Sequence, residues 1–159
     1  MRFSHELIVP EEGLPFKLFL FEGRDGNYFR EKHWHRSVEI FAVCRGDLGF
    51  FIDDKQWHLS ADQFMIVNSN EVHSIDSPMP NETIVLQIPL KMFEEYFTVE
   101  QFIWFTHEPG KKDERFMELL KELYRVYTER QIGYNLKVKS IFYNIMYLLI
   151  KEYRLTQID

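Results

Sequence analysis

The stretch HWHRSVEIFAVCRG, residues 33–46, carries the pattern that decides the fold. It is rich in β-branched and aromatic residues, which favour strands. His33, His35 and Glu39 are all odd-numbered, and side chains two residues apart share one face of an extended strand. Phe41 and Val43 continue this face unless a bulge intervenes. The pattern therefore predicts a strand that directs imidazoles and a carboxylate toward apolar neighbours.

A fourth candidate ligand, His73, follows in the stretch ADQFMIVNSNEVHSIDS, residues 61–77. Three imidazoles and one carboxylate suit a divalent transition metal such as Zn, Ni, Fe, Mn or Cu. The predicted metal ligands are His33, His35, Glu39 and His73. An alternative remains open, in which these side chains are the polar lining of a pocket for an organic molecule. The predicted pocket lining is His33, His35, Glu39, Phe41, Val43 and His73.

The chain divides into two halves by its residue patterns. Residues 1–90 contain short segments rich in β-branched and aromatic residues, separated by turn residues at intervals of about eight to twelve, as in sandwiches and barrels. The predicted strands are 16–21, 38–44, 47–52, 55–59, 63–68 and 83–89. Residues 91–159 are predicted to be helical, because apolar residues recur there at helical spacing. The predicted helices are 90–97, 113–131 and 134–153. We expect one structural domain, a β-barrel (1–90, including an N-terminal arm over 1–15) with a helical appendage (91–159).

The last predicted helix has a wide apolar face. Such a face usually packs on two surfaces, here the barrel and a partner chain. We therefore predict a homodimer through the C-terminal helices, with Ile141 and Leu148 as outward candidates. The alternative is that the whole face packs in a single core.

Composition excludes several classes of protein. The 159 residues carry a net charge of −6, which argues against this domain gripping a phosphate backbone by itself. The single cysteine excludes an internal disulfide framework and fits a reducing, cytoplasmic compartment. The longest apolar run, residues 145–150, is far shorter than a membrane span, so we expect no membrane partner.

In residues 26–46 and 61–77 the sequence resembles the cupin superfamily, whose jelly-roll barrel is built around two motifs. His33, His35, Glu39 and Gly46 match the first motif, with Gly26 as a displaced leading glycine. Asp62 and His73 match the second motif. This chain departs from that motif at Ala61, Asn68, Asn70 and Ser77. These changes affect the geometry of the turns more than the predicted metal ligands.

The resemblance sharpens to the N-terminal sensing domain of AraC-type transcription regulators, over about residues 14–155. It rests on the strand-then-helix order, the turn at 68–74 and the stretch 86–89. It implies a small-molecule effector, with a sugar as one candidate, bound inside the barrel and coupled to a DNA-binding domain that is not in this chain. It also implies dimerisation, and no enzyme activity. A small metal-dependent cupin enzyme, such as a dioxygenase or isomerase using the three histidines and Glu39, is the alternative function.

Overall fold

The computed structural model describes residues 4–5, 13–23, 28–34, 36–69, 71–77, 79–97, 103–106 and 113–155, without the side chains of 4–5, 23, 28–34 and 76–77. The strands are β1 (Ser4–His5), β2 (Lys17–Gly23), β3 (Tyr28–Trp34), β4 (Ser37–Ile52), β5 (Lys55–Ser60), β6 (Phe64–Val67), β7 (His73–Ser77) and β8 (Asn81–Pro89). The helices are the 3₁₀ helix η1 (Leu90–Tyr96), α1 (Glu114–Glu129), α2 (Tyr134–Leu148) and the π-helix η2 (Leu149–Tyr153).

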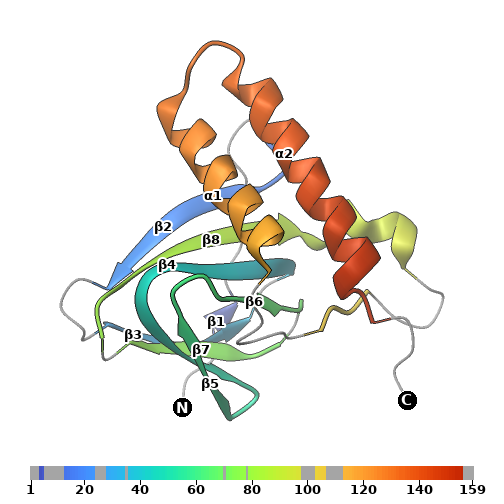
Figure 1. Cartoon of the computed structure of the whole chain (residues 1–159). Helices are drawn as coiled ribbons and strands as arrows, with labels where there is room; N and C mark the ends of the chain where they lie inside the picture. The colour runs from blue at the N-terminus through green and yellow to red at the C-terminus, as the bar shows by residue number, and fades with distance from the viewer. Residues whose placement is uncertain are drawn as a thin grey trace.

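The strands form a jelly-roll of two facing sheets that share the long strand β4 (Figure 1). The first half of β4 pairs with β6 and β8, and β8 pairs with β2. The second half of β4 pairs with β5 and β7, β7 pairs with β3, and β1 runs parallel to β3. The predicted cupin-type barrel followed by helices is confirmed.

Strand β4 corrects the prediction of two strands separated by a turn at residues 45–47. A bulge lies between Val43 and Arg45, and Gly46 has φ +77°, so the strand bends without reversing. A Cβ on Gly46 would lie 2.0 Å from the carbonyl oxygen of Pro80, so only glycine fits here. The bulge lets one strand pass from the first sheet into the second.

The chain between His33 and Glu39 is not one extended strand. Strand β3 ends at Trp34, Arg36 forms a bend, and β4 begins at Ser37. His33 and Glu39 therefore belong to different strands of different sheets. His35, the leading Gly26 and most of the predicted N-terminal arm lie outside the described residues.

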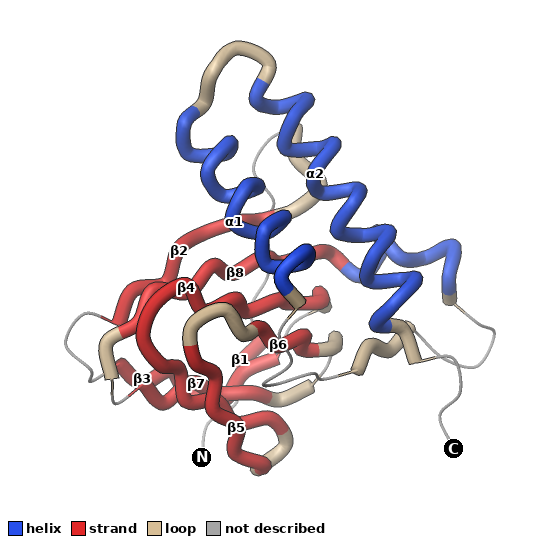
Figure 2. Tube along the Cα trace, in the orientation of Figure 1, coloured by secondary structure: helices blue, strands red, loops and turns tan. Residues whose placement is uncertain are grey.

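The helices cover the outer face of the sheet formed by β2, β8, β4 and β6 (Figure 2). Asp113 caps α1, because its Oδ1 accepts a hydrogen bond from the backbone N–H of Phe116. Arg130 and Gly133 adopt left-handed conformations, which turn the chain into the antiparallel α2. The helical faces and the sheet enclose one continuous apolar core. None of the described helices is both long and apolar enough to cross a membrane.

The structure contradicts the predicted outward residues of the last helix. Ile141 and Leu148 are 5% and 1% exposed and pack in the core between α2 and the sheet. The large apolar side chains that α2 does expose are Leu136, Tyr143 and Tyr147. The periodicity of a helix apolar on nearly every side does not distinguish its buried stripe from its exposed one.

Candidate site inside the barrel

Glu39 lies inside the barrel, on the face of β4 opposite the helices. Its register partners are Val67 on β6 and Gln87 on β8. Its side chain is 1% exposed. Phe41 and Val43 follow on the same face and belong to the apolar cluster that fills the barrel. Strand alternation thus places a carboxylate in an apolar interior, where a charge is costly unless polar partners surround it.

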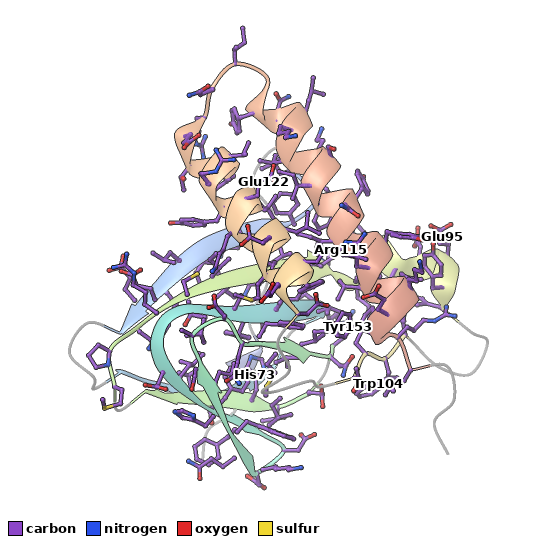
Figure 3. The ribbon with its side chains drawn as sticks, in the orientation of Figure 1. His73, Glu95, Trp104, Arg115, Glu122 and Tyr153 are labelled. Atoms are coloured by element: carbon purple, nitrogen blue, oxygen red, sulfur yellow. The ribbon has the colours of Figure 1, made fainter. Side chains whose placement is uncertain are left out.

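His73 faces Glu39 from the opposite sheet. It opens β7, where its register partners are His33 on β3 and Ile52 on β4. Its Nε2 lies 3.1 Å from Glu39 Oε1, and both side chains are 1% exposed. Its ring stacks on Phe50, with 5.7 Å between ring centroids and 6° between planes. Figure 3 shows His73 among the barrel strands.

A backbone carbonyl orients the His73 ring. Its Nδ1 lies 3.2 Å from the carbonyl oxygen of Glu71, and a carbonyl only accepts hydrogen bonds, so Nδ1 carries a proton. Nε2 is then the atom that meets Glu39. The separation of 3.1 Å between Nε2 and Glu39 Oε1 is short enough for the two atoms to share a cation.

Gln87 is the third polar side chain of the site. It is fully buried, and its Nε2 donates a hydrogen bond of 2.9 Å to Glu39 Oε2. A carboxylate only accepts, so this bond fixes which way round the amide sits. Gln87 Oε1 therefore points away from Glu39, and it has no hydrogen-bond partner among the residues that the structure describes.

Ser37 extends this polar row by one position. It precedes Glu39 by two residues and pairs with Pro89, just as Glu39 pairs with Gln87. Its side chain is buried, and its Oγ also lacks a hydrogen-bond partner within the described part of the chain. Buried polar atoms are almost always satisfied, so two neighbouring exceptions require an explanation.

The polar and apolar parts of the barrel interior are segregated. The polar row is Ser37, Glu39 and Gln87, and His73 faces it from the other sheet. Farther along β8, the same face carries Thr83, and the side chains between it and the polar row are apolar. They include Phe41 and Val85, and Phe50 packs against Phe41. The site can therefore offer hydrogen-bond acceptors beside aromatic surface.

The structure brings together only part of the predicted ligand set. Glu39 and His73 face each other, and Phe41 lies against the His73 ring, with 6.0 Å between centroids. The backbone of His33 stands opposite that of His73. The side chain of His33 and all of His35 lie outside the described residues. The described residues contain no group of three or more histidine, cysteine or acidic side chains arranged to hold a metal ion.

Sequence reasoning missed Gln87 and Ser37. Gln87 interrupts an apolar run of β8, residues 84–88, which is a detectable sign of a buried polar side chain. Ser37 shares the parity of Glu39. Neither sign shows which residues meet, because the pairing of β4 with β8 spans 48 residues between Glu39 and Gln87.

Several solved structures are similar to part of this chain. Solved structures similar to this chain include a cupin superfamily protein from Desulfitobacterium hafniense (14% identity, 51% of this chain, 72% of that chain, TM-score 0.45) and a cupin protein from Bacteroides fragilis (16%, 48%, 67%, 0.45). A variant of oxalate decarboxylase from Bacillus subtilis is also similar (17% identity, 47% of this chain, 21% of that chain, 0.43). The comparison with curated proteins returned no match.

The family model for the AraC-like ligand-binding domain matches residues 15–146. This range includes the polar row in the barrel and most of the helical hairpin that covers it. The order of a cupin-type barrel followed by two long helices is the order that the sequence resemblance implied. The chain therefore belongs to the AraC-like ligand-binding domain family.

Proposed function

We propose that this domain senses a small molecule that binds inside the barrel at the polar row of Ser37, Glu39 and Gln87, facing His73. The observation that carries the proposal is the pair of buried atoms without hydrogen-bond partners in the described structure, Gln87 Oε1 and Ser37 Oγ. A ligand that formed hydrogen bonds with both atoms would bind more tightly, because these bonds are not made in the folded protein without the ligand.

The chemistry of the row indicates the kind of molecule. Gln87 Oε1 and the Glu39 carboxylate accept hydrogen bonds, and the Ser37 hydroxyl can accept or donate. The matching ligand carries several hydrogen-bond donors. The rings of Phe41 and Phe50 offer an apolar wall beside them. A small polyhydroxylated molecule, such as a sugar, has both polar donors and an apolar ring face.

A transition metal is a further proposed occupant, held by His33, His35, Glu39 and His73. The chemistry of the described pair fits this role: His73 Nε2 and a Glu39 carboxylate oxygen, both of which can ligate a transition metal, lie 3.1 Å apart and are buried. The Nδ1 contact to the Glu71 carbonyl is the kind of outer contact that orients metal-bound histidines. A bound ion would supply a positive charge to which a hydroxylated effector could coordinate.

We further propose that the domain forms a cytoplasmic homodimer through α2 and passes its signal to a DNA-binding domain of the same regulator. Leu136, Tyr143 and Tyr147 are 70%, 53% and 55% exposed and lie seven and four residues apart, on one side of the helix. Tyr143 and Tyr147 also line a surface hollow between α2 and η1. Large apolar side chains exposed along one side of a helix are typical of interaction sites.

Thermal unfolding with a panel of monosaccharides and polyols tests the sensing proposal. At least one compound should raise the Tm of the wild-type domain and leave that of Gln87→Leu unchanged. Thr83→Val is the matched control, because Thr83 is also buried but its hydroxyl donates to Asn81 Oδ1. A compound that raises the Tm of all three proteins equally would place its binding site elsewhere.

Elemental analysis tests the metal proposal and separates it from the enzyme alternative. The purified wild type should hold metal near one equivalent, and a His33→Ala/His73→Ala double variant should lose it. A metal-free, folded wild-type protein would refute both the metal site and a metal-dependent cupin enzyme. The sensing proposal would then rest on the organic ligand alone.

A further inference from the structure

The side chain of Asn68 connects the barrel to residues 103–106, which precede α1. Asn68 lies directly after β6 and is buried. Its Nδ2 donates to the carbonyl oxygen of Phe105 at 2.9 Å, and its Oδ1 accepts from the Phe105 backbone N–H at 2.6 Å. The Asn68 amide therefore bonds to both backbone groups of Phe105, as a neighbouring strand would. It joins residues that are 37 apart in sequence.

On the barrel side, Asn68 is bonded to the turn that ends at His73. Glu71 Oε1 accepts from the backbone N–H of Asn68 at 2.8 Å and from Asn68 Nδ2 at 3.0 Å. The carbonyl oxygen of the same Glu71 contacts His73 Nδ1. Glu71 is itself buried. Asn68, Glu71 and His73 are thus joined by hydrogen bonds, with the His73 ring at one end and the Asn68 amide at the other.

On the other side, Phe105 pairs with the residues at which the helical hairpin ends. Phe105 and Arg154 form an antiparallel bridge. The Thr106 N–H donates to Tyr153 O, and the Leu155 N–H donates to Trp104 O, both at 2.9 Å. Figure 3 shows Trp104 and Tyr153 close together at the end of the hairpin. These bonds tie the backbone of residues 153–155 to Phe105 and its two neighbours.

We propose that Asn68 is a positioning residue that couples the His73 ring to the end of the helical hairpin at residues 153–155. The route is His73 to Glu71, Glu71 to Asn68, Asn68 to Phe105, and Phe105 to Arg154. It rests on the proposed function only in that a ligand in the barrel is what displaces His73. A shift of the ring moves the Glu71 carbonyl, and with it the carboxylate that shares Asn68 Nδ2 with Phe105.

The geometry explains why the coupling passes through this amide. Nδ2 divides its hydrogen bonding between an acceptor on Glu71 and an acceptor on Phe105. The amide has two N–H hydrogens, so it makes both bonds at the same time, and a displacement of the Glu71 acceptor moves the amide that holds Phe105. An amide also carries its donor and its acceptor on two separate atoms, whereas a hydroxyl has a single oxygen and a carboxylate has no donor.

Hydrogen exchange at single amides tests this coupling without any effector. The reporters are the Thr106 and Leu155 amides, and the Val43 amide, which donates to Gln63 O in another part of the barrel, is the internal control. His73→Phe keeps an aromatic ring against Phe50 but removes the Nδ1 contact. It should speed exchange at both reporters by about three- to tenfold, the range expected for loss of one hydrogen bond, and leave Val43 unchanged.

The double-mutant comparison separates coupling from a merely structural role of Asn68. In an Asn68→Ala background, His73→Phe should change reporter exchange by less than about twofold, because the route is already broken. Asn81→Ala is the matched control, since Asn81 is an equally buried asparagine that is bonded to Thr83. In that background the full effect of His73→Phe should persist. If Asn68→Ala does not fold, Asn68→Ser serves in its place.

Two results would overturn the proposal. One is unchanged exchange at Thr106 and Leu155 in His73→Phe. The other is an effect of equal size with and without Asn68. Neither result bears on whether a small molecule stabilises the barrel, so failure of the coupling and failure of the sensing proposal are distinguishable.

Discussion

The two faces of the first half of β4 show how one strand serves two purposes. On the even-numbered face, Val38, Ile40 and Ala42 are completely buried in an apolar core beneath the helices. On the odd-numbered face, Ser37 and Glu39 bring polar atoms into the barrel before Phe41 resumes the apolar pattern. Burial is equally complete on both faces. The difference lies in hydrogen bonding: the helix-covered face contributes to stability through apolar contacts, whereas the barrel face carries Ser37, whose Oγ has no hydrogen-bond partner among the described residues.

The largest expected effect is on the helix-covered face. Ile145→Asp places a carboxylate in a fully buried apolar site and should destabilise the domain by about 4 kcal/mol or more, enough to unfold it. Tyr143→Asp, on the exposed side of the same helix, should leave the fold intact. Circular dichroism during thermal unfolding measures both. A folded Ile145→Asp protein would contradict the assignment of α2 to the core.

Neighbouring residues of β4 offer a direct comparison of the two faces. Glu39→Ala leaves Gln87 and His73 without their carboxylate partner, and Ile40→Ala leaves a cavity under the helices. Each should cost about 3 kcal/mol. Only Glu39→Ala should also abolish binding of metal or effector, as calorimetry on the folded fraction would show. Equal binding losses in both variants would remove the functional distinction between the faces.

A smaller effect concerns the exposed stripe of α2. Tyr143→Ala should weaken dimerisation about tenfold or more, the scale of an aromatic hot spot. The free energy of unfolding of the monomer should change by no more than about 0.5 kcal/mol. Sedimentation equilibrium measures the first quantity and urea titration the second. A wild type that is monomeric at all concentrations would refute the proposed dimer.

The smallest effect concerns the attachment of α1 to the barrel. Lys121 donates to Asp62 Oδ1 at 2.7 Å, and this hydrogen bond raises the pKa of Lys121. Stability from the pair is thus complete below the ordinary lysine pKa, about 10.4, and is lost as the pH rises through the raised value. Because both side chains are well exposed, Lys121→Met should cost about 0.5 kcal/mol or less, and the cost should shrink in salt. A large, salt-independent loss would contradict this surface assignment.

The sequence predicts those features that depend on local periodicity. Strand alternation relates Glu39 to Phe41 and Val43, and helical spacing locates α1 and α2 to within a few residues. The two cupin motifs, one carrying Glu39 and the other His73, also predict that these residues meet, although they lie in different sheets. The resemblance to a known family supplies that pairing, since neither alternation nor spacing brings the two sheets together.

The remaining features depend on register and on long-range contacts. The bulge that makes β4 one strand shows in the sequence only as Gly46, which equally predicts a turn. Gln87 meets Glu39 because β8 pairs with β4 in the register that places these two residues opposite each other, and the sequence does not specify that register. The bond between Asn68 and Phe105 has no local signal at all. Contacts of this kind follow from the packed structure, and local propensities do not encode them.

The central claim is that Ser37 Oγ and Gln87 Oε1, the two atoms of the polar row without hydrogen-bond partners in the described structure, serve binding and not folding. The free energy of unfolding of Ser37→Ala, set beside that of Thr83→Val in the absence of ligand, tests it most directly. Both changes remove a buried hydroxyl, but only that of Thr83 has a hydrogen-bond partner in the described structure. We expect Thr83→Val to cost about 1 kcal/mol, and Ser37→Ala to leave stability unchanged or raise it. A loss of about 1 kcal/mol or more for Ser37→Ala would contradict the claim.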